Sequence, residues 1–143
     1  MSVNAAFSTS TSDQWATTQD YFDVIDERYG PFLLDVCATP QNAKCERFYT
    51  KDGLANPWSA NNWMNPPYGC DVGSWIKRAF DETKNGNTTV ALLPARIDAR
   101  LFHEYICGKH EFHLLCGYPE FGGAGSSAPF SAMLVIFGRT PRT

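Results

Sequence analysis

The chain has little of what marks secreted, membrane-spanning or strongly basic proteins. Its 5 cysteines are odd in number and none are spaced C-x-x-C, which argues against a disulfide framework or a zinc ribbon. No apolar run approaches membrane-spanning length, and residues 1–12 lack the basic start and apolar core of a signal peptide. We therefore expect a cytoplasmic protein that contacts no membrane.

Basic residues are also scarce. The 12 Lys and Arg residues face 15 Asp and Glu residues, for a net charge of −3. A nucleic-acid-binding domain is usually basic overall or carries a basic patch. Any contact with nucleic acid must therefore rely on a local patch, a partner or dimerisation.

The length of 143 residues fits one domain. We expect a flexible arm over residues 1–13, a single domain over 14–138 and a flexible, basic tail over 139–143. Apolar runs and helical periodicity predict strands and helices that alternate along the chain. The predicted helices cover residues 17–29, 72–84 and 98–107, and the predicted strands cover 32–36, 45–49, 63–64, 88–93, 111–116 and 131–137. This alternation is typical of an α/β fold with a mixed, mostly parallel sheet, helices on both faces and an antiparallel C-terminal hairpin.

The stretch Asn65-Pro66-Pro67-Tyr68 follows the short predicted strand at Trp63 and Met64 and precedes the helix at 72–84. Two consecutive prolines have a fixed φ and lack N–H groups, so the turn is stiff. The Asn65 side-chain oxygen and the Pro66 carbonyl can form a fork of two acceptors, which suits a nitrogen carrying two hydrogens. Tyr68 offers a flat face on which a planar ring can stack. Such a site can orient an aromatic amine and free its lone pair for methyl transfer.

Together with other stretches, this motif resembles the phage-type DNA N6-adenine methyltransferases (Dam-like). The stretches are Phe32-Leu33-Leu34-Asp35-Val36-Cys37-Ala38, Asn42-Ala43-Lys44-Cys45, Asp52-Gly53-Leu54, Trp63-Met64-Asn65-Pro66-Pro67-Tyr68-Gly69, Leu93-Pro94-Ala95-Arg96-Ile97-Asp98 and Ala128-Pro129-Phe130-Ser131. The resemblance covers about residues 15–137. It implies a compact Rossmann-like class I fold that uses S-adenosylmethionine (SAM) to methylate N6 of an adenine flipped out of DNA.

The resemblance also assigns residues. Asn65, Pro66, Pro67 and Tyr68 would form the catalytic motif, and Tyr68, Arg96 and Phe130 would contact the substrate. The cofactor would meet Trp15, Thr17, Asp35, Cys37, Ala38, Asp52 and Asn65. One departure from the usual pattern stands out, because no Gly-x-Gly follows Asp35.

Several assignments have a structural alternative, and the Pro-Pro-Tyr stretch can be a polyproline II turn or a short recognition peptide. Thr17 can simply cap a helix and Trp15 can pack on the core, Asp35 can cap a turn, and Arg96 can form a surface ion pair. His103, Cys107, His110 and His113 lie close together in sequence, but their spacing fits no closed zinc site, and we expect no metal.

Three functions stay open. The first is DNA N6-adenine methylation, and the absence of a Pro-Cys pair argues against the cytosine-C5 reaction. The second is methylation of a protein glutamine amide or of RNA, because a carboxamide presents the same two N–H donors. The third is a non-catalytic binding module with a decayed cofactor site. With little room for a separate recognition domain, we expect DNA to be recognised by short loops, with a homodimer as one arrangement, in the host cytoplasm if a phage encodes the protein.

Overall fold

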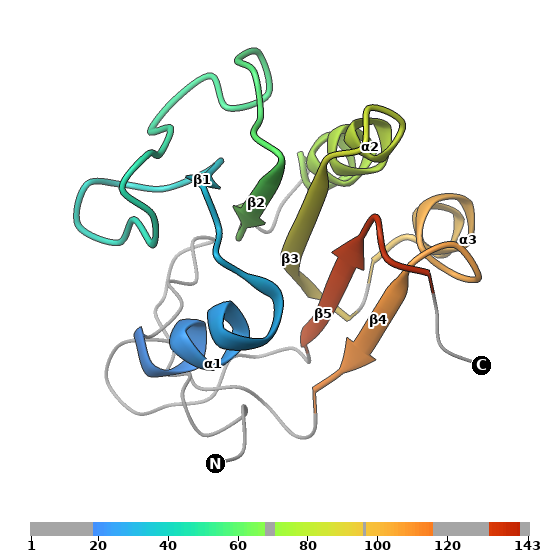
Figure 1. Ribbon diagram of the computed structural model, residues 1–143. Coiled ribbons are helices and arrows are strands. Elements are labelled where there is room, and N and C mark those ends of the chain that lie inside the picture. Colours follow the sequence, from blue (N-terminus) through green and yellow to red (C-terminus); the bar gives the residue numbers. More distant parts are fainter. Residues whose placement is uncertain (1–18, 68–70, 96, 116–131, 141–143) are drawn as a thin grey trace.

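The computed structural model of the chain describes residues 19–67, 71–95, 97–115 and 132–140. Strands and helices alternate over these ranges, as the sequence predicts (Figure 1). In chain order the elements are α1 (Gln19–Tyr29), β1 (Leu34–Asp35), β2 (Asn61–Met64), α2 (Val72–Thr83), β3 (Thr88–Pro94), α3 (Ala99–Tyr105), β4 (Glu111–Leu114) and β5 (Ala132–Phe137).

One mixed sheet joins the five strands in the order β1-β2-β3-β5-β4. The pairs β1–β2 and β2–β3 are parallel, whereas β5 runs antiparallel to both β3 and β4. Four strands therefore point one way and β5 points the other way. This arrangement confirms the predicted mixed α/β sheet and its antiparallel C-terminal hairpin.

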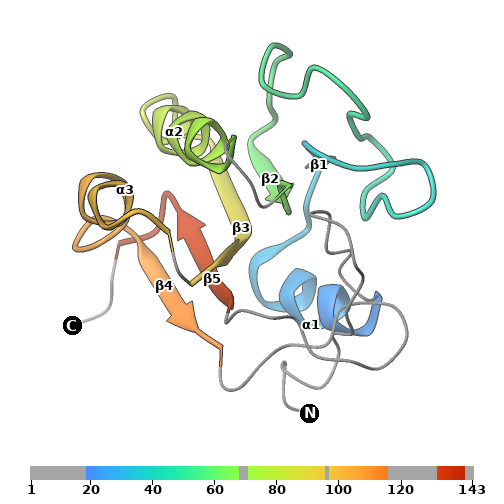
Figure 2. The same ribbon diagram turned by 180° about the vertical axis from the view of Figure 1, so that it is seen from behind.

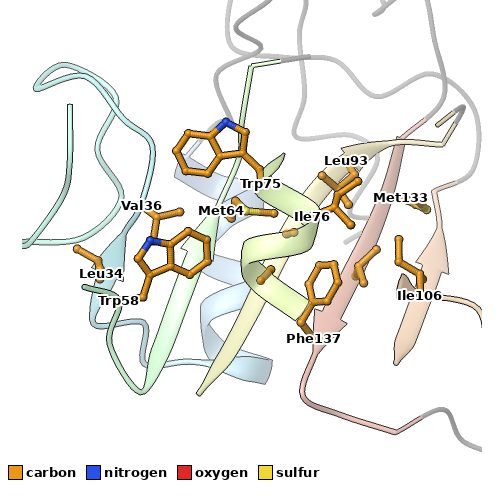
Figure 3. Close-up of a cluster of buried hydrophobic side chains, with 13 residues drawn as sticks. Leu34, Val36, Trp58, Met64, Trp75, Ile76, Leu93, Ile106, Met133 and Phe137 are labelled. Atoms are coloured by element: carbon orange, nitrogen blue, oxygen red, sulfur yellow. The ribbon is translucent and has the colours of Figure 1, made fainter. Parts of the chain in front are cut away.

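Helices cover both faces of the sheet. Because alternate side chains of a strand point to opposite sides, each central strand contributes to the core on either face. Val90 and Leu92 of β3 belong to the core beneath α1, whereas Ala91 and Leu93 belong to the core beneath α2 and α3. Figures 1 and 2 show the sheet between these two groups of helices from opposite sides. Figure 3 shows the larger core, which Trp58 and Trp75 join from outside the sheet.

Helix α1 buries the face that its spacing predicts. Tyr21, Phe22 and Ile25 are buried, and the Phe22 ring meets the Trp63 ring edge to face, with centroids 5.2 Å apart. The helix stops before Gly30-Pro31, as predicted. No helix in the described ranges is long and apolar enough to cross a membrane.

Helices α2 and α3 also match their predicted patterns. Trp75, Ile76 and Ala79 of α2 are buried, and Gly86 follows the helix with a positive φ of 81°. The predicted cap of α3 is present, since the Asp98 side chain accepts a hydrogen bond from the Arg100 amide at 2.8 Å.

The predicted strand at 45–49 is reduced to a single bridge between Asp35 and Phe48. The Asp35 amide donates to the Arg47 carbonyl at 3.0 Å, and the Tyr49 amide donates to the Asp35 carbonyl at 3.0 Å. Glu46 and Arg47 are exposed, so the segment has too few buried apolar side chains to extend the pairing. β1 is likewise shorter than predicted.

Asn62 ties the beginning of β2 to its surroundings. Its side chain is fully buried, and its Oδ1 atom accepts from the Ser59 amide and the Ser59 hydroxyl, both at 2.8 Å. Its Nδ2 atom donates to the carbonyls of Ser59 and Thr88, both at 2.9 Å. Every polar atom of this buried amide therefore has a partner, which the sequence pattern did not indicate.

Asn62→Ala should lower the free energy of unfolding by about 3 kcal/mol, because it removes four hydrogen bonds to the fully buried amide and leaves partly buried groups of Ser59 and Thr88 without this partner. Urea unfolding followed by tryptophan fluorescence measures this change, with exposed Asn85→Ala as the control variant. Equal midpoints for the two variants would contradict this role for Asn62.

Candidate active site

The carboxyl ends of the three parallel strands meet at one edge of the sheet. β1 ends at Asp35, β2 at Met64 and β3 at Pro94. The register pairs Asp35 with Trp63 and Met64 with Ala91, and the Val36 amide donates to the Trp63 carbonyl at 3.1 Å. The segments after Asp35 and after Met64 are therefore neighbours. Open α/β sheets bind their ligands at this kind of edge.

The Asn65 motif leaves β2 at this edge, directly after the buried Met64. Asn65 is half-buried, and its side-chain oxygen is shielded from solvent. Pro66 is buried and Pro67 is half-buried, so the start of the turn packs against the protein. The structure thus confirms that the motif follows a strand and precedes a helix.

The Asp35 carboxyl group is closed off from water, with the residue only 2% exposed. Its Oδ1 atom accepts from the Cys37 amide at 3.3 Å, and its Oδ2 atom accepts from the Lys44 amide at 3.0 Å. Asp35 therefore organises the loop from 36 to 44, which is the turn-capping role that the sequence left open. A ligand role and this structural role are compatible, because each carboxyl oxygen has two lone pairs.

Burial raises the pKa of Asp35 to about 7, and the Lys44 and Cys37 amides oppose this shift only in part. Burial and the neighbouring Asp35 likewise raise the pKa of the Cys37 thiol to about 11. The thiol therefore stays protonated at neutral pH and is a weak nucleophile. Ala38 is buried, and its amide donates to the Tyr49 carbonyl at 2.9 Å.

A tight turn brings Asp52 and Gly53 to the same region. Asp52 is exposed and has a φ of 57°. A Cβ atom on Gly53 would lie 2.1 Å from the Val36 carbonyl oxygen and 2.9 Å from the Trp75 ring. Only glycine fits between the end of β1 and α2 here, so Gly53 lets this turn pack closely against the end of β1.

The sequence suggests that Trp58 stacks or covers the core, and it does both, but the contacts of Trp58 and Arg78 with this turn were not predicted. The Trp58 indole donates to the Gly53 carbonyl at 2.7 Å, and its ring stacks on Trp75 with centroids 6.3 Å apart. Arg78 of α2 bonds to the turn as well. The bonded residues lie 5 to 24 positions apart in sequence, so no local pattern predicts these contacts. The one local indication of this turn in the sequence is the pair Asp52-Gly53.

Other predicted site residues lie outside the described residues, namely Trp15, Thr17, Tyr68, Arg96 and Phe130. The described histidines serve separate contacts. His110 accepts from the Gly138 amide at 3.1 Å, and His113 lies 2.7 Å from the Glu111 carboxylate. Within the described ranges, no group of three His, Cys, Asp or Glu residues could hold a metal ion.

Comparison with known proteins identifies the family of this chain. The family described as DNA N-6-adenine-methyltransferase (Dam) matches residues 4–115, which include Asp35, Asp52 and Asn65. The chain belongs to this family. The Dam family match ends before the block at residues 128–131.

Two phage proteins are similar to this Dam family member. The DNA N-6-adenine-methyltransferase of Escherichia phage T1 is 33% identical over 97 residues, which are 64% of this chain and 40% of that protein. The protein of the same name from Haemophilus phage HP1 (strain HP1c1) is 33% identical over 88 residues, which are 59% of this chain and 50% of that protein. The matched parts thus span about half of these relatives or less. No solved structure matches the chain at a significant level.

The raised pKa of Asp35 makes a prediction about stability. The ordinary pKa is 3.8 and the folded value is about 7, so the folded state holds a proton between these pH values that the unfolded state releases. The contribution of Asp35 to the free energy of unfolding is therefore fully present below about pH 4. It falls as the pH rises from there and is lost once the pH has passed through about 7.

Between pH 4.5 and 8, the free energy of unfolding of the wild type should fall by about 2–4 kcal/mol more than that of Asp35→Asn. Urea unfolding at several pH values measures the difference, and exposed Asp20→Asn is the control. A constant difference between wild type and Asp35→Asn across this range would show that Asp35 titrates normally.

Proposed function

We propose that this chain transfers a methyl group from SAM to N6 of adenine in DNA. The observation that carries the proposal is the position of Asn65-Pro66-Pro67-Tyr68, which begins where β2 ends in a member of the Dam family. The names of the two phage relatives favour the same reaction. The mixed sheet with helices on both faces is compatible with a Rossmann-like class I methyltransferase fold, which we propose for this domain.

In the proposed reaction, the Asn65 side-chain oxygen and the Pro66 carbonyl would accept hydrogen bonds from the two N–H groups of N6. This interaction orients the amine and concentrates its lone pair toward the methyl donor. Tyr68 stacks on the adenine after it leaves the duplex, and Phe130 supplies the second face. Because the amine itself attacks, the reaction needs no nucleophile from the protein, and the protonated Cys37 thiol is consistent with this.

SAM supplies an electrophilic methyl group on a positively charged sulfur. The residues at the sheet edge fit such a group, because the buried Asp35 carboxyl can ionise beside a ligand cation or accept from ligand hydroxyls. The close packing of Gly53 on the end of β1 presents Asp52 to the same region. We propose Asp35, Cys37, Ala38, Asp52 and Asn65 as cofactor contacts, with Trp15 and Thr17 covering the site.

DNA binding by an acidic chain needs local contacts. We propose that Arg96, which follows β3, contacts a phosphate or a base, and that short loops provide recognition. Dimerisation would double such contacts and remains a prediction, as does action in the host cytoplasm. The negative net charge favours the second candidate, a protein glutamine amide, more than it favours DNA or RNA.

Transfer of labelled methyl from SAM to unmethylated DNA tests the proposal. The wild type should yield N6-methyladenine, and Asn65→Ala should lower the rate by about 100-fold or more, because it removes one of the two acceptors on the reacting amine. Asn85→Ala, an exposed asparagine beyond α2, is the control and should retain wild-type activity.

The other outcomes separate the alternatives. SAM binding without label on DNA would contradict the proposal and favour a protein amide or RNA as substrate. Failure to bind SAM and to transfer methyl would leave a non-catalytic binding module. Equal rates for Asn65→Ala and wild type would contradict the assigned role of the motif.

A further inference from the structure

Arg78, in the middle of α2, connects this helix to the turn that carries Asp52. Its side chain is only 21% exposed. The Nη1 atom donates to the Leu54 carbonyl at 2.7 Å, and the Nη2 atom donates to the Asn56 carbonyl at 2.9 Å. One guanidinium therefore bonds to the carbonyl groups of the residues before and after Ala55.

The guanidinium is itself fixed in orientation. Its Nε atom donates to Glu82 Oε2 at 2.7 Å, and Glu82 Oε1 accepts from the Asn87 side chain at 2.7 Å. The plane lies over the Trp58 ring, with Cζ 4.7 Å from the ring centroid. Glu82 and Trp58 therefore orient the two Nη atoms toward the turn.

The turn that Arg78 holds is a compact unit. The Asp52 carbonyl accepts from the amides of Ala55 and Asn56, at 2.9 and 3.1 Å, and from the Asn56 side chain at 2.9 Å. Gly53 lies between Val36 and Trp75 without room for a Cβ atom. A shift of residues 54–56 would therefore move Asp52 and Gly53 relative to the end of β1.

We infer that Arg78 is a positioning residue for cofactor binding, which holds Asp52 and Gly53 in place through the carbonyls of Leu54 and Asn56. This inference rests on the proposed function, in which Asp52 contacts SAM. Helix α2 begins at Val72, four residues after the last residue of the Asn65 motif in sequence. Lysine cannot replace arginine here, because a single ammonium lacks the planar fork that reaches three acceptors at once.

The test compares Arg78→Lys and Arg78→Met with the wild type. Lys77→Met is the matched control, since Lys77 lies on the same helix with its side chain 61% exposed and forms an ion pair with Asp81, four residues on. Steady-state kinetics give KM for SAM, KM for DNA and kcat at saturating concentrations of both. Amide hydrogen exchange follows Ala55 and Asn56, with Val90 and Leu92 of β3 as reference amides.

Both Arg78 variants should raise KM for SAM by about tenfold, the order expected for loss of a charge-assisted hydrogen bond. KM for DNA and kcat should stay within about twofold of wild type. The amides of Ala55 and Asn56 should exchange faster, whereas those of Val90 and Leu92 should not. Lys77→Met should change none of these quantities. Should Arg78→Met fail to fold, the lysine variant carries the same test.

Faster amide exchange at Ala55 and Asn56 in the Arg78 variants with an unchanged KM for SAM would overturn the inference. Wild-type exchange rates at these two amides in the Arg78 variants would overturn it as well. A parallel change in all three kinetic parameters with faster exchange in β3 would indicate general destabilisation and would also overturn it. A wild type that neither binds SAM nor transfers methyl would instead contradict the proposed function itself.

Discussion

The buried carboxyl group of Asp35 is the constraint on which the candidate site depends. It lies at the end of β1, is almost closed to water, and accepts hydrogen bonds from two amides of the loop that follows. The backbone of Asp35 pairs with β2 on one side and with Arg47 and Tyr49 on the other. These contacts hold both the short strand β1 and the loop beside it.

The cost of burying this carboxyl group explains its chemical character. Without a bound ligand its pKa is about 7, well above the ordinary value, because the Lys44 and Cys37 amides and the Lys44 charge replace its lost hydration only in part. A positively charged ligand or a set of hydroxyl donors at the same edge would favour the ionised form. Asp35 thus combines a structural role in the loop with a capacity to respond to a ligand.

Much of the fold could be predicted, because local patterns determine it. The spacing of Trp75, Ile76 and Ala79 identifies α2, and unbroken apolar runs identify β3 and β5, which are buried on both faces. The position of the Asn65 motif after a strand was likewise predicted correctly. The order of strands in the sheet follows from contacts between distant residues, which these patterns do not contain.

Less of the site could be predicted, for the same reason. The hydrogen bonds from Arg78 to the carbonyls of Leu54 and Asn56 join residues 24 and 22 positions apart. In the sequence, Arg78 is simply one charged residue of an amphipathic helix. The segment at 45–49 has strand-like residues but forms one bridge, because its exposed side chains cannot stabilise an edge strand. The roles of Tyr68, Arg96 and Phe130, outside the described residues, remain predictions.

The most direct test of the central claim is the number of protons released when SAM binds. Titration calorimetry at pH 6 in buffers of different ionisation enthalpy measures this number. If Asp35 ionises on contact with the cofactor, the wild type should release up to about one proton per SAM bound, and Asp35→Asn should release almost none. Equal proton release by the wild type and Asp35→Asn would contradict a role for Asp35 in binding the cofactor.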